Sequence, residues 1–263
     1  MSEAQPLWRA ACLAVPQWRR AESEEGREQP RGRLGGAAAR VERYCERYFD
    51  SDWRSMYRLR PRLRTDGIYI SRNQDLRRGQ VELRTRVAVH IVRWFRYLVF
   101  LPDGSFLYRT TPSPPSAQWC MARARTALRT PGVLSGELST TAAGGVHTAI
   151  TMTSGQLSVL HTWLRLRSTC PGAHNRLDIR SMVSVDDGAT EPPEPDADFD
   201  AYTDGDGAAG WHAAAGVVGA WEEEGAVRAH SRGLTPYVFV PWEDLETTDL
   251  NLDTDQMDYY VPG

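Results

Sequence analysis

The amino-acid sequence predicts a mainly β protein, an antiparallel barrel or sandwich preceded by short N-terminal helices. From Asp66 onward, several segments rich in aromatic and β-branched residues alternate apolar and polar positions with a period of two, which is typical of strands. Short stretches of Gly, Pro, Asp and Ser separate these segments, as the turns of an antiparallel sheet require. Before Asp66, the apolar spacing is that of amphipathic helices. Many short strands favour closure of the sheet, because closure removes exposed edges.

The composition is that of an ordinary soluble globular protein. The 263 residues suffice for one large β domain or two small domains, and 41% of them are hydrophobic and 25% charged. The sequence has neither an apolar run long enough to cross a membrane nor a secretory signal, so we expect no membrane partner. Four separated cysteines without a CxxC motif predict reduced thiols in a cytoplasmic or nuclear protein. These cysteines are Cys12, Cys45, Cys120 and Cys170.

The net charge of -3 conceals a gradient from a basic front to an acidic tail. Residues 1–100 carry 21 arginines and 12 acidic residues, whereas residues 186–263 carry 2 arginines and 19 acidic residues. The arginines are spread along helices and strands rather than gathered in one block, so we expect no nucleic-acid partner. All 31 basic residues are arginine, which we attribute first to the nucleotide composition of the source genome.

The first sixty residues predict short helices and one linker. Residues 6–15 form a helix with a proline in its first turn, and the charged, Gly- and Pro-rich residues 22–36 form a linker. The next segment has apolar residues at i, i+3, i+4, i+7 and i+8, which predicts an amphipathic helix. These residues are Val41, Tyr44, Cys45, Tyr48 and Phe49. Ser51 or Asp52 then caps another short helix, which Pro61 ends.

The segment 66–111 predicts a short strand, a charged connection and a long hairpin. We interpret Asp66 and Gly67 as turn residues at the start of the strand. The first arm of the hairpin alternates, with Arg93, Phe95, Tyr97 and Val99 on one face and Trp94, Arg96, Leu98 and Phe100 on the other. A turn closes this hairpin, because proline presets φ and glycine accepts a positive φ. The turn residues are Pro102, Asp103 and Gly104.

The remaining chain predicts further strands and one acidic insertion. The predicted strands are 133–139, 146–153, 157–169, 175–185, 217–221, 226–231 and 237–241, and residues 117–129 form a helical turn or a loop. Alternation places Leu177, Ile179, Val183 and Val185 on one face of a single strand. The acidic residues 186–210 cannot bury a core, so we expect a solvated or disordered loop there.

The sequence contains none of the common catalytic motifs. It lacks GxSxG, GxGxxG, HExxH and a phosphate-binding P-loop, and its six histidines never have metal-ligand spacing. The acids near Asp204 lack the spacing of a calcium loop. We therefore predict no catalytic residues, no metal and no cofactor.

Three stretches carry a family resemblance. WRSMYRLRPRLRTDGIYISR (53–72), VRWFRYLVFLPDGSFLYRTTPSPP (92–115) and RGLTPYVFVPWEDLETTDLNLDTDQMDYYVPG (232–263) resemble the C-terminal domain of the F-box only protein 9 family, and the last stretch is similar to its plant and algal members. The signature residues that this chain shares with that pattern are Trp53, Arg54, Pro61, Asp66, Gly67, Tyr69, Pro102, Asp103 and Gly104.

The resemblance implies a domain organisation. Residues 61–263 would form a lipocalin-like antiparallel barrel, with 186–210 as an acidic insertion, and residues 21–60 a linker with amphipathic helices. We expect the barrel interior to be filled by large side chains. The candidates are Phe95, Tyr97, Leu160, Leu164 and Leu166. Residues 1–20 resemble only the last helix of an F-box, which implies either a truncated gene model or lost adaptor docking. Its adaptor-side residues would be Leu7, Trp8, Cys12 and Leu13.

The function that the resemblance implies is non-catalytic. F-box proteins dock on the Skp-type adaptor of a cullin–RING (SCF) ubiquitin ligase, and the β domain would present a protein substrate. The absence of lysine would then also prevent self-ubiquitination of side chains. Because the F-box is incomplete, two alternatives remain: a barrel that binds a small ligand, and an interaction module that works without the adaptor.

Overall fold

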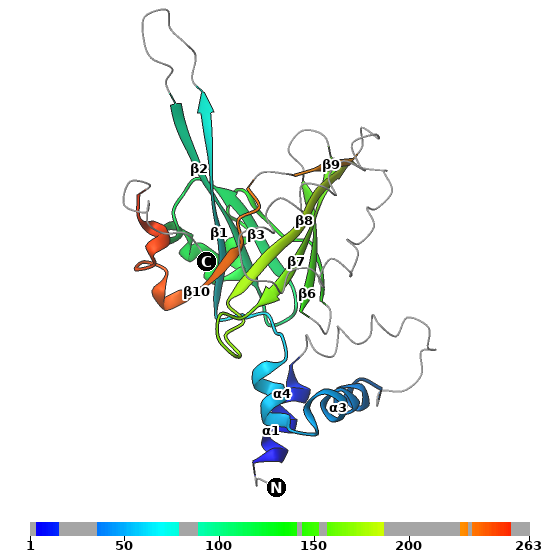
Figure 1. Cartoon of the computed structure of the whole chain (residues 1–263). Coiled ribbons are helices and arrows are strands. Elements are labelled where there is room, and N and C mark those ends of the chain that lie inside the picture. The colour runs from blue at the N-terminus through cyan, green and yellow to red at the C-terminus, as the bar shows by residue number, and fades with distance from the viewer. Residues whose placement is uncertain are drawn as a thin grey trace, which may run out of the picture.

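The computed structural model of the chain describes residues 4–15, 36–78, 89–140, 144–152, 157–186, 227–230 and 233–253. The protein is mainly β: one curled antiparallel sheet forms a barrel-like body, and three short helices lie together beyond one end of it (Figure 1). This arrangement confirms the predicted class of an antiparallel, barrel-like β protein preceded by N-terminal helices.

The helical unit consists of α1 (Gln5–Ala14), α3 (Gly36–Phe49) and α4 (Trp53–Leu59). The carboxylate of Asp52 caps α4 by accepting hydrogen bonds from the backbone N–H groups of Arg54 (3.1 Å) and Ser55 (3.3 Å). The helix stops just before Pro61, as predicted. The three helices enclose their own apolar cluster of Cys12, Val41, Cys45 and Met56. The predicted linker 22–36 lies outside the described residues except for its last residue.

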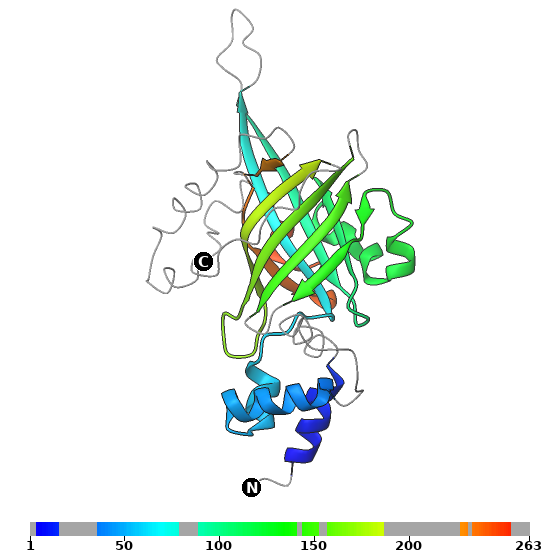
Figure 2. The same ribbon diagram turned by 90° about the vertical axis from the view of Figure 1, so that its right-hand side faces the viewer.

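The sheet contains β1 (Gly67–Arg78), β2 (Val89–Phe100), β3 (Phe106–Thr111), β4 (Val133–Leu134), β5 (Glu137–Thr140), β6 (Gly145–Met152), β7 (Ser158–Arg167), β8 (Arg176–Asp186), β9 (Val227–Ala229) and β10 (Tyr237–Pro241). The strand order is β4-β3-β2-β1-β10-β8-β7-β6-β5, with β9 paired to β8. The C-terminal strand β10 therefore lies between β1 and β8. Figure 2 shows the resulting curl of the sheet.

The two edge strands of this sheet, β4 and β5, are neighbours in the chain. Only Ser135 and Gly136 separate them, so one segment borders both β3 and β6 and links the two edges covalently. A side chain at Gly136 would come within 2.0 Å of the carbonyl oxygen of Ala149, which shows how closely this segment approaches β6. The prediction of one strand over 133–139 is wrong, because its two halves pair with opposite edges.

The hairpin of β1 and β2 is longer than predicted. The two strands stay paired from Tyr69 opposite Leu98 to Arg78 opposite Val89, well beyond the body of the barrel (Figure 1). The prediction of a short strand followed by a charged connection is therefore wrong. The charged residues Asp75, Arg77 and Arg78 belong to β1 and pair with residues of β2.

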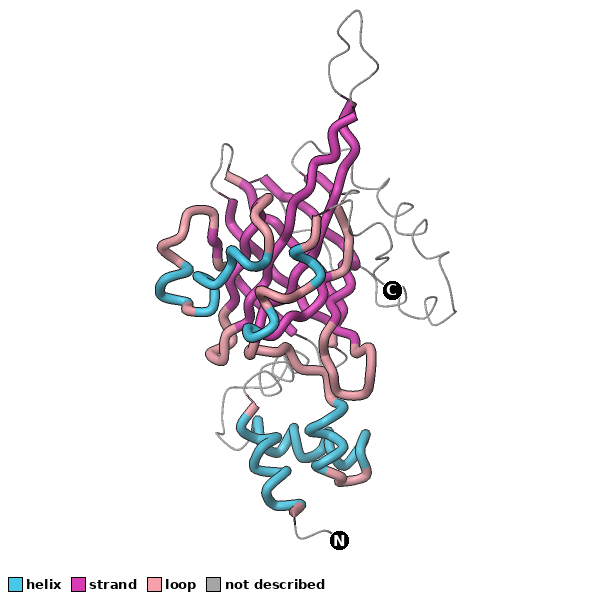
Figure 3. The backbone as a smooth tube through the Cα atoms, turned by 90° about the vertical axis from the view of Figure 1, so that its left-hand side faces the viewer, coloured by secondary structure: helices cyan, strands magenta, loops and turns pink. Residues whose placement is uncertain are grey.

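Large side chains fill the barrel interior, including three of the predicted ones, Leu160, Leu164 and Leu166. Phe95 and Tyr97, which were also expected inside, point outward instead, and Leu98 and Phe100 take the inner face. Phe95 and Tyr97 belong to an outer cluster that lies among η1 (Pro115–Ala122), α5 (Ala124–Ala127), η4 (Trp242–Asp244) and η5 (Asp249–Asn251). Figure 3 shows helical segments against this face of the sheet. Both faces of β2 are buried, so alternation could not tell inside from outside.

A bulge in β8 reverses its faces. Ser181 pairs with Trp163 but Ile179 pairs with the next residue, Leu164, so Arg180 has no opposite residue in β7. An extra residue moves every later side chain to the other face of a strand. Ile179 and Met182 therefore pack on the interior cluster, whereas Val183 and Val185 pack outside with Trp163. The prediction of one continuous face through Val185 is wrong for this reason.

Two predicted turns have different outcomes. The hairpin turn at 102–105 is confirmed: Gly104 has a φ of 84°, and the Asp103 carboxylate accepts the Ser105 N–H at 2.9 Å. Gly67, by contrast, is the first residue of β1 and is absent from the positive-φ residues. Glycine is required at this position because a side chain would not fit: a Cβ there would lie 2.3 Å from the carbonyl oxygen of Val240.

The other predicted elements are also located. Residues 117–129 form the short helices η1 and α5, β9 occupies three residues of the predicted strand 226–231, and β10 coincides with 237–241. The predicted strand 217–221 and nearly all of the acidic insertion 186–210 lie outside the described residues. Among the helices described, none has the length and apolar character needed to span a membrane.

Gly67→Ala tests the close approach of β1 and β10. We expect a loss of about 1–3 kcal/mol in the free energy of unfolding, because the added methyl group overlaps the backbone of β10. Urea denaturation measures this loss. Gly132→Ala is the control for backbone strain alone, since Gly132 has a φ of +75° but open space around its Cβ position. An unchanged urea midpoint for Gly67→Ala would contradict the close packing.

Candidate protein-interaction site

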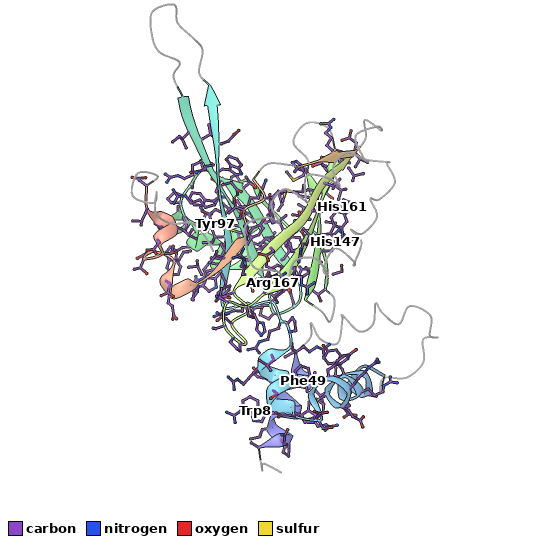
Figure 4. The ribbon with its side chains drawn as sticks, in the orientation of Figure 1. Trp8, Phe49, Tyr97, His147, His161 and Arg167 are labelled. Carbon is purple, nitrogen blue, oxygen red and sulfur yellow. The ribbon has the colours of Figure 1, made fainter. Side chains whose placement is uncertain are left out.

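The predicted adaptor-side residues all lie on α1, but only one of them projects fully into solvent. Leu7 is 75% exposed. The Trp8 ring packs on Tyr57 of α4 with centroids 5.4 Å apart, and Leu13 packs on the helical cluster (Figure 4 labels Trp8). Cys12 is completely buried, so it supports α1 from behind. The exposed side of α1 that Leu7 marks is thus the part that a partner can reach.

Polar contacts fix α1 against α4. Gln5 accepts a hydrogen bond from the backbone N–H of Trp53 (3.2 Å) and donates one to the carboxylate of Asp52 (3.3 Å). The Cys12 thiol lies 3.5 Å from the Trp53 carbonyl oxygen. Arg9 forms an ion pair with Glu42 of α3. No local pattern in the sequence points to Gln5, because its partners lie almost fifty residues away.

The two buried thiols of the helical unit are unreactive at neutral pH. Burial is the main cause that raises the pKa of Cys12 to about 12 and that of Cys45 to about 11. Both groups are therefore protonated at neutral pH and are poor nucleophiles.

Within the described ranges, no three His, Cys, Asp or Glu side chains gather closely enough to hold a metal ion.

The segment between α4 and β1 joins the helical unit to the barrel through alternate arginines. Arg60 lies over the ring of Tyr44 (4.0 Å), Arg62 over Tyr57 (4.5 Å) and Arg64 over Phe239 (3.8 Å). Each such contact stabilises by roughly 0.5–2 kcal/mol depending on its burial. Leu63, between two of these arginines, points into the barrel core and is 4% exposed. This segment therefore anchors both units at once.

The hydroxyl of Tyr69 completes the junction. It donates a hydrogen bond to the carbonyl oxygen of His174 (2.7 Å) and accepts one from the backbone N–H of Arg64 (3.2 Å). Burial raises the pKa of Tyr69, so the phenol stays protonated. Gly172 in the same β7–β8 turn lies against α4, since a Cβ there would be 2.6 Å from the Arg58 carbonyl oxygen. One barrel end is thus occupied by the helical unit.

The other signature residues also serve the junction or its turns. Trp53 supplies its backbone to α1, and Arg54 donates its backbone N–H to the Asp52 cap while its side chain is exposed. A side chain at Gly144 would lie 3.1 Å from Pro61, so Pro61 sits beside the start of β6. Asp66 pairs with Arg64 at 2.5 Å. The arginines at 60, 62 and 64 and His174 were missed, although the run RLRPRLR alternates visibly.

Tyr69→Phe tests the hydroxyl of the junction. We expect a loss of about 1–3 kcal/mol in the free energy of unfolding, because the His174 carbonyl oxygen and the Arg64 N–H both lose a partner. Tyr108→Phe is the matched control, since that interior hydroxyl accepts from Thr110 on its own strand. Equal effects of the two variants on the urea midpoint would contradict a special role for Tyr69.

The pKa of His174 predicts a stability loss in mild acid. Burial, followed by the charge of Arg62, lowers the pKa of His174, so the unfolded chain binds a proton more readily than the folded one. The resulting stabilisation is complete above the unfolded pKa of about 6.5 and is lost as pH falls below it. His174→Asn keeps a residue suited to the φ of 47° and should reduce the difference in urea midpoint between pH 7.5 and 5.5. An unchanged difference would contradict this assignment.

Comparison with known proteins places this geometry in a family context. The family model described as "F-box only protein C-terminal region" matches residues 42–263, which include the second half of α3, α4 and all ten of the strands described. No solved structure matches the chain.

Proposed function

Because this chain belongs to the family of the F-box only protein C-terminal region, we propose that it is the non-catalytic substrate-recognition subunit of an SCF-type ubiquitin ligase. The family match over 42–263 is the observation that carries the proposal. In it, the barrel holds a protein substrate while the helical unit faces the Skp-type adaptor and, through it, the cullin scaffold.

The position of α1 supports this division of tasks. The family match begins at residue 42, so α1 precedes it in the chain, where an F-box would be. The inner side of α1 is fixed to α4 by Gln5 and Cys12, while Leu7 remains 75% exposed. A large exposed apolar side chain on an otherwise packed helix is a suitable anchor for a partner. Leu7 is therefore the residue of α1 that we expect to contribute most to adaptor binding.

The junction supports the proposal in a second way. A ligase subunit must hold its substrate at a defined place relative to the adaptor, because ubiquitin transfer depends on positioning. The stacked arginines, Leu63 and the Tyr69 hydroxyl tie α4 to the barrel within a few residues. Such a junction would hold the barrel in a fixed orientation relative to the helical unit.

We place this function in the cytoplasm or nucleus. All four cysteines are free, and Cys170 is exposed. Free thiols persist where the surroundings keep them reduced.

Leu7→Asp tests the adaptor-side role of α1. We expect capture of the Skp-type adaptor to fall about tenfold or more, because a charge would replace an apolar anchor. The measurement is a quantitative pull-down with the chain and with a version extended by the genomic sequence upstream of Met1. Leu128→Asp is the matched control, since Leu128 is 55% exposed next to α5 on the barrel.

Two results would count against the proposal. If neither version captures the adaptor, the ligase function fails. If both capture it and Leu7→Asp binds as well as Leu128→Asp, α1 does not provide the contact.

A further inference from the structure

The barrel interior changes character along β1 and β2. At the end near the helical unit it holds Tyr69, Leu98 and Phe100 in the apolar core. Farther along the same inward faces come Ser71, Asn73 and Arg96, which are 0%, 2% and 8% exposed. Ser71 and Thr110 are the residues opposite Arg96 on its two neighbouring strands. We call Ser71, Asn73, Arg96, Ser184 and His230 the polar interior cluster.

Arg96 places a positive charge in this cluster. Its guanidinium donates a hydrogen bond to the carbonyl oxygen of Gly233. In the described part of the chain, no carboxylate forms an ion pair with it. Arg93, on the opposite face of the same strand, does pair with an acid, Asp253, at 3.3 Å. A guanidinium has five N–H donors, and a buried charge is costly unless an opposite charge and hydrogen bonds compensate it.

Asn73 adds an unused acceptor beside that charge. Its side-chain nitrogen donates to the backbone oxygen (3.3 Å) and the hydroxyl (3.0 Å) of Ser71, and that hydroxyl donates to the Thr235 carbonyl oxygen (2.6 Å). Since a backbone carbonyl only accepts, these contacts fix the orientation of the amide. The Asn73 Oδ1 atom is buried and receives no hydrogen bond.

Gly233 shows that the two groups converge. The glycine has a φ of +69°, and its missing side chain would lie 3.3 Å from Asn73 Oδ1 and 3.4 Å from the Arg96 Nη1 atom. The nearest atom to that position is a ring carbon of Trp94, at 2.9 Å, so Trp94, Asn73 and Arg96 converge on the Gly233 backbone. The unsatisfied Asn73 oxygen and the guanidinium of Arg96, whose Nη1 donates to Gly233, thus lie beside the same glycine.

The remaining members of the cluster are neutral. His230 and Ser184 share a hydrogen bond of 2.8 Å, and burial followed by the charge of Arg96 lowers the pKa of His230. Neutral imidazole neither competes with Arg96 for an anion nor neutralises it. The positive charge of the cluster is therefore concentrated on Arg96.

We propose that the polar interior cluster binds a carboxylate that carries an N–H donor two bonds away from its carboxyl carbon. Arg96 would hold the carboxylate, and Asn73 Oδ1 would accept the N–H. This chemistry occurs in the C-terminal residue of a peptide chain and in a free N-acyl amino acid. The proposal goes beyond the ligase function and does not depend on adaptor binding.

A capture experiment with the full chain tests the site. The immobilised protein is mixed with a randomised heptapeptide pool that has either free or amidated C-termini, and retained peptides are quantified by mass spectrometry. We expect about tenfold more retention of the free-acid pool, the size of one hydrogen-bonded charge pair. Titration calorimetry with N-acetylalanine tests whether the ligand is a free N-acyl amino acid. If N-acetylalanine binds and neither peptide pool is retained, the ligand is a free N-acyl amino acid rather than a peptide C-terminus.

Matched variants separate binding from folding. The variants Arg96→Gln and Asn73→Ala should lose the preference for the free-acid peptides. The control Arg93→Gln makes the same change on the outer face of β2 and should keep this preference. Arg96→Gln should also leave the urea midpoint equal or higher, because an uncompensated buried charge disfavours the folded state. Absence of binding by both probes, equal retention of acid and amide, or a large loss of stability in Arg96→Gln would overturn the proposal.

Discussion

The fold depends on the insertion of the C-terminal strand β10 between β1 and β8. Strands β1 to β4 form one half of the sheet and β5 to β8 the other, and β10 is the strand that joins them on one side. Its register sets Gly67 opposite Pro241 and Tyr69 opposite Phe239. The two rings meet edge to face at 5.0 Å, and the close approach is possible because Gly67 has no side chain. Pairing of residues so distant in sequence costs loop entropy, which the aromatic contacts offset.

The same strand also ties the barrel to the helices. Phe239 of β10 is covered by Arg64, and Tyr69 beside it reaches the backbone of Arg64 and His174. Formation of the barrel and docking of the helical unit therefore share the same side chains. A subunit built in this way has one end of its barrel already occupied. In the proposed function, a substrate would therefore bind at the opposite end, on the β1–β2 hairpin or on the outer surfaces, and would be separated along the molecule from the adaptor (Figure 1).

The sequence predicted features that local chemistry decides. The cap at Ser51 or Asp52, the stop at Pro61 and the turn at Gly104 all follow from the residues themselves, and the structure shows each of them, with Asp52 as the cap. The predictions failed where contacts between residues distant in sequence decide which face of a strand is buried. Phe95 and Tyr97 were assigned to the interior because their alternation fits either face, and only the cover by η1 and the C-terminal segment explains why they point outward. The bulge at Arg180 left no local signal that would show a reversal of faces. In the candidate site, Leu7 and Cys12 lie on one helix, yet burial gives them different tasks.

The contrast between the two ends of the interior decides which alternative functions the barrel can support. Near the helices, Tyr69, Phe100 and Phe239 fill the space with rings, which leaves an apolar carrier little reason to bind there. At the other end, the Asn73 oxygen is buried without a hydrogen bond, and the Arg96 side chain is held by the Gly233 carbonyl oxygen and by no carboxylate of the described residues. Natural cores avoid such groups because they lower stability, and exceptions cluster where a ligand supplies the missing partner. A barrel that is filled by aromatic rings at its helical end and, among the described residues, carries a buried arginine without an acidic partner at its other end is better suited to recognising a polar chemical group than to storing an apolar molecule.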